Sequence, residues 1–319
     1  MVRVAIEGAS GYSGIELTRI LAGHPGVELV GVASGRWDGD SIRERTGLPG
    51  PAGRLCYRKS LLKAELEVEA VLCATPANAS QELIPAWIER GVRVVDLSNA
   101  FREEACQADS PWVYGLSEHA REAIKATRLV ANPGCYPTAT QNALLPLITA
   151  GLIAPGPLVI DAKSGVTGAG RSTGEHLLYN EMADNHYPYR VGSHQHVPEL
   201  ERGLGRELLF TPHLLPTRRG LFVSCYVPVV SGTSAADLEA CLRERYADEP
   251  FVQVVSADRA LGVRDVVGTP LVRVAVGSTI KAGLARVFGC LDNLLKGAAS
   301  QATQNLNLCL GLPETQGLI

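Results

Sequence analysis

A cysteine near the middle of the chain has the setting of a catalytic nucleophile. Cys135 follows a strand-like run at residues 129–131 and a Pro-Gly pair, and it opens an apolar-periodic segment that predicts a helix running toward Ile148. The positive field at a helix N-terminus can lower a thiol pKa from about 8.5 and produce a thiolate, which is both nucleophile and acyl carrier. The Pro-Gly turn would expose the side chain and free adjacent amides to bind an oxyanion. We therefore expect Cys135 to act covalently, and the other seven cysteines to be small buried hydrophobes.

A histidine pair supplies the candidate proton carrier. His194 and His196 flank Gln195, and Glu199 follows three residues later. Imidazole titrates near neutral pH, so we expect His194 to be a general acid/base that Glu199 orients. The competing interpretation is a metal pair, because His-x-His in a strand places both rings on one face. No third and fourth ligand with a recognisable spacing is present, and we expect no metal.

Two loops rich in glycine are candidate sites for anions. The first lies between a strand and a helix, and its candidate cofactor-binding residues are Gly8, Ser10, Gly11, Tyr12, Ser13 and Gly14. Its backbone N–H groups can meet a pyrophosphate at the positive end of the helix, although its spacing is G-x-x-G-x-x-G rather than the usual G-x-G-x-x-G. The second strand ends at Ser34 and Arg36 without an acidic residue for a ribose 2′-hydroxyl. These two residues suit a 2′-phosphate, so we expect NADP(H).

The second loop, residues 161–171, also follows a strand and carries two cations and two hydroxyls. Lys163, Ser164, Gly165 and Arg171 indicate a site for a substrate phosphate or for the nicotinamide end of the cofactor. Residues 210–220 add His213, Arg218 and Arg219, and for that segment a structural loop and a site both remain open.

The elements that must position these residues follow two patterns. In the first half, short apolar runs alternate with helical patterns, at residues 2–6, 14–22, 27–33, 70–74, 81–90 and 92–97. This alternation predicts a Rossmann-type, doubly wound parallel sheet with crossover helices. In the second half, longer β-like runs with one helix among them predict an α+β domain with a mixed sheet, at residues 158–162, 208–210, 221–230, 235–246, 251–255 and 271–280. Residues 292–310 predict one last amphipathic helix.

Composition narrows the class of protein. The chain has 319 residues and a formal net charge of −3, which offers no electrostatic footprint for nucleic acid or acidic membranes. The length suggests about two domains. The eight cysteines form no C-x-x-C pair, and no run of about 18 apolar residues or leader-like start is present. We expect a cytoplasmic protein.

Taken together, the motifs resemble the N-acetyl-gamma-glutamyl-phosphate reductase family, NADPH-dependent acyl-phosphate reductases of arginine biosynthesis in the semialdehyde dehydrogenase superfamily. The resemblance is carried by residues 8–14, 132–138, 163–171, 194–199, 210–220, 292–298 and 304–308. It implies a dinucleotide-binding domain, residues 1–134 completed by residues 291–319, and a catalytic, substrate and oligomerisation domain at residues 135–290. It further implies a homodimer or homotetramer, with Cys135 as the thioester-forming nucleophile and His194 as the proton carrier. The substrate-binding candidates are Arg102, Asn132, Lys163, Arg171, Gln195 and Arg218.

Several segments depart from the family pattern where substrate would be recognised. Gln195 replaces the usual arginine between the histidines, Ser117 replaces a proline, and residues 76–78 and 98–102 also differ. The chemistry is retained, whereas the acyl group stays open between N-acetyl-gamma-glutamyl phosphate and a relative such as an aminoadipyl phosphate, free or on a carrier protein. Two other functions remain: an aldehyde dehydrogenase running the same thioester chemistry oxidatively, and a noncatalytic NADP-binding regulator.

Overall fold

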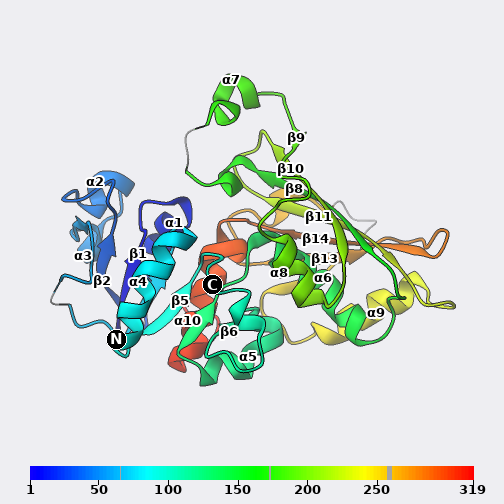
Figure 1. Ribbon diagram of the computed structural model, residues 1–319, viewed down its shortest axis with the longest axis horizontal. Helices are drawn as coiled ribbons and strands as arrows, with labels where there is room; N and C mark the ends of the chain where they lie inside the picture. Colours follow the sequence, from blue (N-terminus) through cyan, green and yellow to red (C-terminus); the bar gives the residue numbers. More distant parts are fainter. Residues whose placement is uncertain (65, 172–173, 257–260) are drawn as a thin grey trace. The chain divides into compact units, whose positions relative to one another are not determined.

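Two seven-stranded sheets organise the chain, each within its own unit (Figure 1). The computed structural model describes residues 1–64, 66–171, 174–256 and 261–319. Unit 1 comprises Met1–Gly134 and Ala298–Ile319, and unit 2 comprises Cys135–Gly297. The last 22 residues therefore return to the N-terminal unit.

The sheet of unit 1 has the order β3-β2-β1-β4-β5-β7-β6, and every neighbouring pair is parallel. Its strands are β1 (Val2–Glu7), β2 (Val27–Ala33), β3 (Tyr57–Arg58), β4 (Ala70–Cys73), β5 (Arg93–Asp96), β6 (Val113–Tyr114) and β7 (Leu129–Ala131). Strand β4 is buried along its whole length, as expected for a parallel sheet covered on both faces. Such a sheet collects loop residues at the carboxyl ends of its strands, where α/β proteins bind ligands.

The helices of unit 1 connect these strands and include the C-terminal helix. They are α1 (Tyr12–Ala22), α2 (Ile42–Thr46), α3 (Gly50–Gly53), α4 (Ala77–Glu89), the 3₁₀ turn η1 (Glu104–Cys106), α5 (Ser117–Ala126) and α10 (Ser300–Leu310). Helix α10, red in Figure 1, packs against α5, α1 and β5 of the same unit. Ten of its eleven residues are buried although many are polar, so hydrogen bonds must compensate their desolvation.

The sheet of unit 2 is mixed, with the order β12-β13-β14-β11-β8-β10-β9. Its strands are β8 (Leu158–Gly165), β9 (Tyr187–Pro188), β10 (Leu208–Leu215), β11 (Leu221–Pro228), β12 (Val252–Val254), β13 (Val272–Val276) and β14 (Leu284–Leu291). Residues alternate between buried and more exposed along β8 and β10, because one face packs on a core and the other does not.

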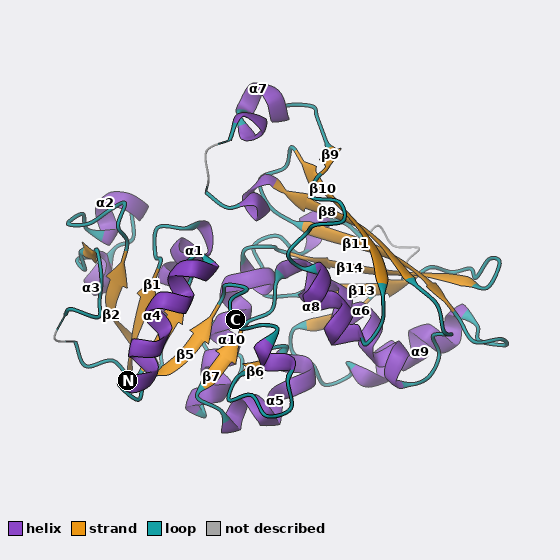
Figure 2. Cartoon of the chain, in the orientation of Figure 1, coloured by secondary structure: helices purple, strands orange, loops and turns teal. Residues whose placement is uncertain are grey.

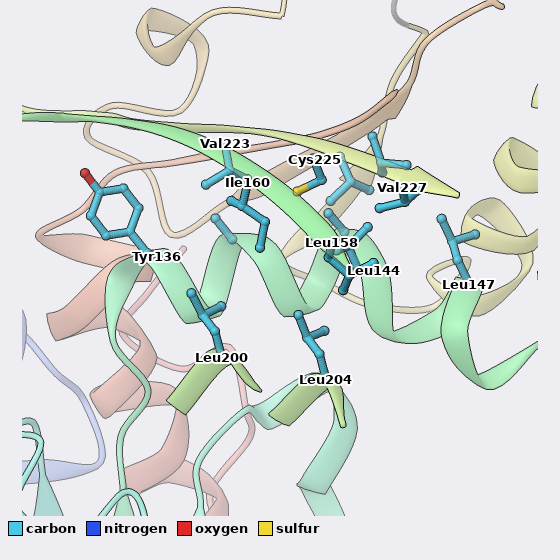
Figure 3. Packing of buried hydrophobic residues seen from close by; sticks show 14 of the residues in the cluster. Tyr136, Leu144, Leu147, Leu158, Ile160, Leu200, Leu204, Val223, Cys225 and Val227 are labelled. Atoms are coloured by element: carbon cyan, nitrogen blue, oxygen red, sulfur yellow. The ribbon is translucent and has the colours of Figure 1, made fainter. Parts of the chain in front are cut away.

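Helices cover the core face of this sheet. They are α6 (Cys135–Thr149), α8 (Val197–Leu204) and α9 (Ala235–Arg245). Figure 3 shows Leu144 of α6 beside Leu158 of β8, with Leu200 and Leu204 of α8 on the other side of the helix. The connection from β8 to β10 carries the short elements η2 (Val166–Ala169), η3 (Glu175–Leu177) and α7 (Tyr179–Met182), and Figure 2 shows α7 away from the sheet.

The expected fold class is confirmed: a Rossmann-type parallel sheet and a second domain with a mixed sheet. Three details of the expectation were wrong. Strand β14 was not expected, and β10 continues to Leu215, so Pro212 and His213 belong to a strand rather than a loop. The C-terminal helix begins at Ser300 and not at Asp292, because the π-helical turn η5 (Leu295–Ala299) precedes it. Among the described residues, no helix is both long and apolar enough to cross a bilayer.

Candidate active site

Cys135 is the first residue of helix α6 and is partly exposed, whereas Tyr136 after it is buried. The first-turn N–H groups of a helix have no partner within it, and the helix dipole places partial positive charge there. The first turn of α6 itself, as the structure describes it, contains no acidic residue that would oppose that field. The local setting thus favours a thiolate at Cys135.

His194 lies buried in a cage of aromatic rings. The ring centroids of Tyr136, Tyr189 and Phe210 lie 5.6, 5.4 and 5.3 Å from that of His194, all in edge-to-face orientations. His196 lies 4.9 Å away in the same manner. These rings exclude water from His194, and a charged imidazole would lose its hydration there without gaining a carboxylate partner.

Hydrogen bonds determine which nitrogen of His194 carries the proton. The backbone N–H of His196 donates to Nδ1 at 3.1 Å, and Nε2 lies 3.4 Å from the hydroxyl of Tyr189. An acceptor Nδ1 in a neutral imidazole requires the hydrogen on Nε2. Tyr189 in turn donates to the hydroxyl of Tyr136 at 3.4 Å. His194, Tyr189 and Tyr136 therefore form one chain of polar atoms that starts beside Cys135.

Burial sets the protonation states along this chain. Desolvation, with the nearby positive charge of Arg190, lowers the pKa of His194 to about 4. Desolvation also raises the pKa of Tyr189 to about 12 and that of Tyr136 well above its usual value. At neutral pH the imidazole is uncharged and both phenols keep their protons. His194 can then donate a proton from Nε2 without first being an imidazolium.

The other residues of the histidine motif divide between core and surface. His196 and Glu199 are buried, and Gln195 is exposed between the two histidines. The segment is a turn leading into α8, not a strand, with Glu199 in the first turn of that helix. Both nitrogens of His194 have partners other than the Glu199 carboxylate. In the parts of the chain that the structure describes, no three His, Cys, Asp or Glu side chains gather as a metal site requires.

The second glycine-rich segment was expected to be a loop after a strand, but β8 continues to Gly165, so Lys163, Ser164 and Gly165 lie inside the strand. Lys163 forms an ion pair with Asp161 of the same strand. Ser164 is buried, and its hydroxyl donates to the carbonyl of Gly165 at 3.1 Å. A Cβ at Gly165 would lie 2.7 Å from the carbonyl oxygen of Thr217, so this glycine admits the neighbouring backbone. Arg171 is exposed at the end of the loop.

Of the two arginines after β10, Arg218 is exposed and Arg219 is bound in an ion pair within the protein. Arg219 forms an ion pair with the buried carboxylate of Asp292, with 3.2 Å between Nε and Oδ2. The guanidinium of Arg218 is exposed, while its carbonyl accepts a hydrogen bond of 2.7 Å from Thr167. Arg218 is therefore the better placed of the two to bind an anion from solution.

In the first glycine-rich loop, packing leaves no room for a side chain at Gly8 or Gly14 but does leave room at Gly11. A Cβ added to Gly8 would lie 2.5 Å from the carbonyl oxygen of Ala74. A Cβ added to Gly14 would lie 2.4 Å from the carbonyl oxygen of Gly8. Gly8 also has a φ of 80°. At Gly11 the nearest atom would be 3.5 Å away. Packing leaves space above Gly11, as the close approach of a pyrophosphate to the loop requires.

The start of helix α1 fits an anionic cofactor. Gly11 is its N-cap, no side chain caps it, and Tyr12, Ser13 and Gly14 provide first-turn N–H groups. Ser34 is buried: its hydroxyl donates to Ser10 at 2.7 Å and accepts from the backbone N–H of Arg36 at 3.2 Å. Ser34 thus shapes the turn, and the exposed side chain of Arg36 remains for a 2′-phosphate.

Arg102 and Asn132 are both buried and hold backbone in unit 1. Arg102 donates from Nε to the carbonyl of Asn132 at 2.9 Å and from Nη2 to that of Leu97 at 2.8 Å. The side-chain oxygen of Asn132 accepts a hydrogen bond of 3.0 Å from Asn305. These contacts fix the chain three residues before Cys135.

Sequence reasoning missed Tyr136, Tyr189, Arg190 and Phe210, which surround His194. Aromatic residues at strand and helix positions are typical of a core, so no spacing marked them. Arg190 carries a weak signal only in the structure, where its φ of 48° is unusual for a residue other than glycine.

Comparison with known proteins gives matches over nearly the whole chain. Residues 3–127 match the family model described as semialdehyde dehydrogenase, NAD binding domain, and residues 135–293 match semialdehyde dehydrogenase, dimerisation domain. The chain is 40% identical to the N-acetyl-gamma-glutamyl-phosphate reductase of Magnetococcus marinus, over 99% of this chain and 97% of the relative. It is 39% identical to that of Brevibacillus brevis, over 100% and 98%.

Solved structures share the fold at lower identity. Aspartate semialdehyde dehydrogenase II from Vibrio cholerae superposes with a TM-score of 0.77 at 20% identity, covering 97% of this chain and 98% of that one. The aspartate semialdehyde dehydrogenase with NADP from Candida albicans gives a TM-score of 0.73 at 16% identity, with the same coverage.

Proposed function

The chain belongs to the N-acetyl-gamma-glutamyl-phosphate reductase family, and on that basis we propose that it reduces N-acetyl-gamma-glutamyl phosphate to the semialdehyde with NADPH, releasing phosphate, as a step of arginine biosynthesis. The observation that carries the proposal is Cys135 at the first turn of α6, in the same unit as the caged His194. Because the relatives' name gives N-acetyl-gamma-glutamyl phosphate and no carrier protein, we propose the free substrate rather than one held by a carrier protein.

The thiol performs the first step. The Cys135 thiolate attacks the acyl carbon, the S–C bond forms, and the C–O bond to phosphate breaks with the electron pair leaving on phosphate. A thioester is electrophilic enough to accept hydride where a carboxylate is not. The glycine loop Gly8–Gly14 and Arg36 would hold NADPH, which would supply a hydride when bound.

The caged histidine handles the proton. Reduction of the thioester leaves a hemithioacetal oxygen that bears negative charge, and the Nε2–H of a neutral imidazole can stabilise it or protonate it. On collapse, the oxygen's proton returns to His194, the C–S bond breaks with its electron pair going to sulfur as the thiolate of Cys135, and the aldehyde is released. In this account His194 is the proton carrier, the N–H of His196 holds it in the donor tautomer, and the hydroxyl of Tyr189 orients the ring through Nε2. Glu199, buried in the first turn of α8, would act indirectly, because both nitrogens of His194 have other partners.

The anionic groups of the substrate need cations and amides. We assign Arg218 and Arg171 to the phosphate or carboxylate, because both guanidinium groups are exposed. Lys163 would have to exchange its ion pair with Asp161 for one with substrate. Gln195 is exposed where the family usually has arginine, and Asn132 and Arg102 act by fixing the chain before the thiol. We propose Ser164 and Gly165, which are both buried, for the nicotinamide end of the cofactor.

The open face of the unit 2 sheet supports association between copies of the chain. Val159, Leu209 and Tyr226 are neighbours in register on three adjacent strands, and they are 38%, 63% and 38% exposed. Residues 135–293 match a dimerisation domain. An exposed apolar row on a sheet is typical of an interface, and we propose a homodimer or homotetramer that uses it. The reaction chemistry needs a reduced thiol, so we propose the cytoplasm as its compartment.

The test is NADPH oxidation, followed by absorbance, with acyl phosphates that differ in chain length and N-substituent. We expect turnover with N-acetyl-gamma-glutamyl phosphate, none with Cys135→Ser, and slower turnover with the one-carbon-longer substrate. Turnover that survives Cys135→Ser would refute the covalent route. NADPH-induced stabilisation without turnover on any acyl phosphate would instead identify a noncatalytic regulator.

A matched pair of variants tests the proton carrier. His194→Asn and His196→Asn remove adjacent imidazoles of similar burial. We expect the loss at His194 to be about a hundredfold in kcat, the usual scale for an acid/base group, and to exceed the loss at His196. The reverse order would move the role to His196.

A further inference from the structure

The backbone that follows β14 approaches the nucleophilic cysteine very closely. A Cβ built on Gly297 would lie 2.7 Å from Cys135 Cβ, 3.1 Å from Leu291 Cδ1 and 3.3 Å from the carbonyl oxygen of Asp292. The first separation is shorter than Cβ contacts in real proteins. The atom it meets is the first side-chain atom of Cys135 rather than the far end of a flexible chain, so bending the side chain cannot relieve the clash.

A hydrogen bond of the π-helical type shapes this approach. The N–H of Gly297 donates to the carbonyl of Asp292, five residues earlier, at 2.9 Å, and Leu295 donates to the same carbonyl at 3.2 Å. π-helical turns are rare in proteins, and those that occur are often found at functional sites. We call Asp292–Gly297 the thiol turn.

The carboxylate of Asp292 holds the thiol turn at its start. Asp292 is completely buried, and Oδ1 accepts from the N–H groups of Leu294 at 2.8 Å and Leu295 at 3.2 Å. Oδ2 accepts from the N–H of Gly268 at 2.8 Å, and the carboxylate also pairs with Arg219. A buried charge is costly unless it is paired and hydrogen-bonded, and here backbone amides and a guanidinium satisfy both oxygens.

Asn293 joins the same turn to the loops that carry the candidate anion-binding residues. Its side-chain oxygen accepts from the N–H of Gly220 at 2.8 Å, and its amide donates to the hydroxyl of Thr167 at 3.0 Å. Thr167 lies in the second glycine-rich loop, and Gly220 directly follows Arg219. One short segment therefore touches the cysteine, the glycine-rich loop and the arginine pair, all within unit 2.

From these contacts we infer that the thiol turn sets the position of the Cys135 sulfur for the reaction, with Gly297 as a positioning residue whose missing side chain makes room for the cysteine, and Asp292 as the positioning residue that holds the turn. This inference rests on the proposed function for its effect on turnover. The reactivity of the thiol can be measured without turnover, so the two can fail separately.

The test compares Gly297→Ala with Gly262→Ala. Gly262 lies in the same unit, and a Cβ there would meet no atom within 4 Å. We expect Gly297→Ala to lower kcat by roughly tenfold to a hundredfold, since a displacement of about 1 Å at a reacting group costs that much, and KM to change little. The rate at which iodoacetamide alkylates Cys135, followed by peptide mass spectrometry, should fall and its dependence on pH should shift. Gly262→Ala should match the unsubstituted protein in both measurements.

Asp292→Asn supplies a second variant that changes no side-chain volume. Its amide keeps one acceptor oxygen, so it cannot accept both from the N–H groups of Leu294 and Leu295 and from that of Gly268. The thiol turn then loses part of its hold, and the alkylation profile should move in the same direction as in Gly297→Ala. Asp248→Asn, at an exposed position of unit 2, is its control. If Gly297→Ala does not fold, Asp292→Asn decides.

Unchanged alkylation in whichever of the two variants folds would overturn the inference. Normal alkylation of the unsubstituted protein together with no acyl-phosphate reduction would count against the proposed function alone. A fall in unfolding temperature with an unchanged alkylation profile would show a purely structural role and would also overturn the inference.

Discussion

At the scale of single residues, reactivity depends on which protons are present at neutral pH. The cage around His194 keeps the ring uncharged, and the N–H of His196 on Nδ1 leaves the hydrogen on Nε2. A neutral imidazole is a weaker acid than imidazolium, but it needs no prior protonation and suits a site where an oxyanion must be met at pH 7.

This burial makes stability depend on pH. The pKa of His194 is about 4 in the folded protein against 6.5 ordinarily, so the unfolded chain binds more protons between these values. The contribution of neutral His194 to the free energy of unfolding is complete above pH 6.5. It is lost as the pH falls toward 4, and the loss is on the order of 3 kcal/mol. Denaturant titrations should show His194→Gln losing less stability than the unsubstituted protein over this range. The exposed His186→Gln is the control, and an equal loss in both variants would contradict the cage.

Tyr189 tests the hydrogen-bonded chain itself. Tyr189→Phe keeps the aromatic ring beside His194 and removes the hydroxyl that lies 3.4 Å from both Nε2 and the hydroxyl of Tyr136. We expect kcat to fall about tenfold, with the pH profile of kcat changed, because Nε2 of His194 loses its hydrogen-bond partner and the ring is no longer held in place. Tyr179→Phe, at a residue that is 83% exposed, should leave the kinetics unchanged. Identical profiles for both variants would remove Tyr189 from the account.

At the scale of elements, different glycines of the loop before α1 serve packing and cofactor binding. Gly14 has no room for a side chain, whereas Gly11 does. Gly14→Ala should therefore lower the thermal unfolding temperature, and Gly11→Ala should keep it while NADPH affinity, measured by calorimetry, falls at least tenfold. If Gly11→Ala bound NADPH normally, the loop would not be the pyrophosphate site.

Helix α10 contributes a buried polar network rather than an apolar stripe. The side chain of Asn305 donates to the carbonyl of Gly115 at 2.8 Å and to Asn132 at 3.0 Å, and accepts from Ser117 at 2.9 Å. Asn305→Ala would leave these buried groups unpaired, and we expect a loss of about 2–4 kcal/mol in the free energy of unfolding. Gln81→Ala, at an exposed amide on α4, should cost less than about 0.5 kcal/mol. Similar losses for the two variants would mean that the network adds little.

The sequence predicted those elements that neighbouring residues define by themselves. The alternation of short apolar runs with helical periods predicted β1, α1 and β2, and a thiol after Pro-Gly predicted the start of α6 at Cys135. Strand β14 contains Arg286, Gly289 and Cys290 among its larger apolar residues, and these three residues weakened the apolar pattern in the sequence. The aromatic cage of His194 joins α6, β10 and the turn before α8, and such contacts between distant segments leave no local spacing to read.

At the scale of the whole molecule, the open sheet face predicts self-association. Leu209→Arg places a charge in the apolar row formed with Val159 and Tyr226. Light scattering should then give the mass of one chain, 33.9 kDa, where the unsubstituted protein gives a multiple of it. Leu178→Arg, at another exposed leucine of unit 2, should leave the assembly intact. An unchanged mass for Leu209→Arg would place the interface elsewhere.

The central claim is that the acyl group passes through the sulfur of Cys135, and trapping that acyl-enzyme tests it most directly. The protein would be mixed with N-acetyl-gamma-glutamyl phosphate in the absence of NADPH, quenched in acid and digested for mass spectrometry. The account predicts an N-acetylglutamyl adduct on the peptide that contains Cys135, which disappears when NADPH is added before the quench. Steady turnover in the same preparation with no adduct on that peptide would contradict it.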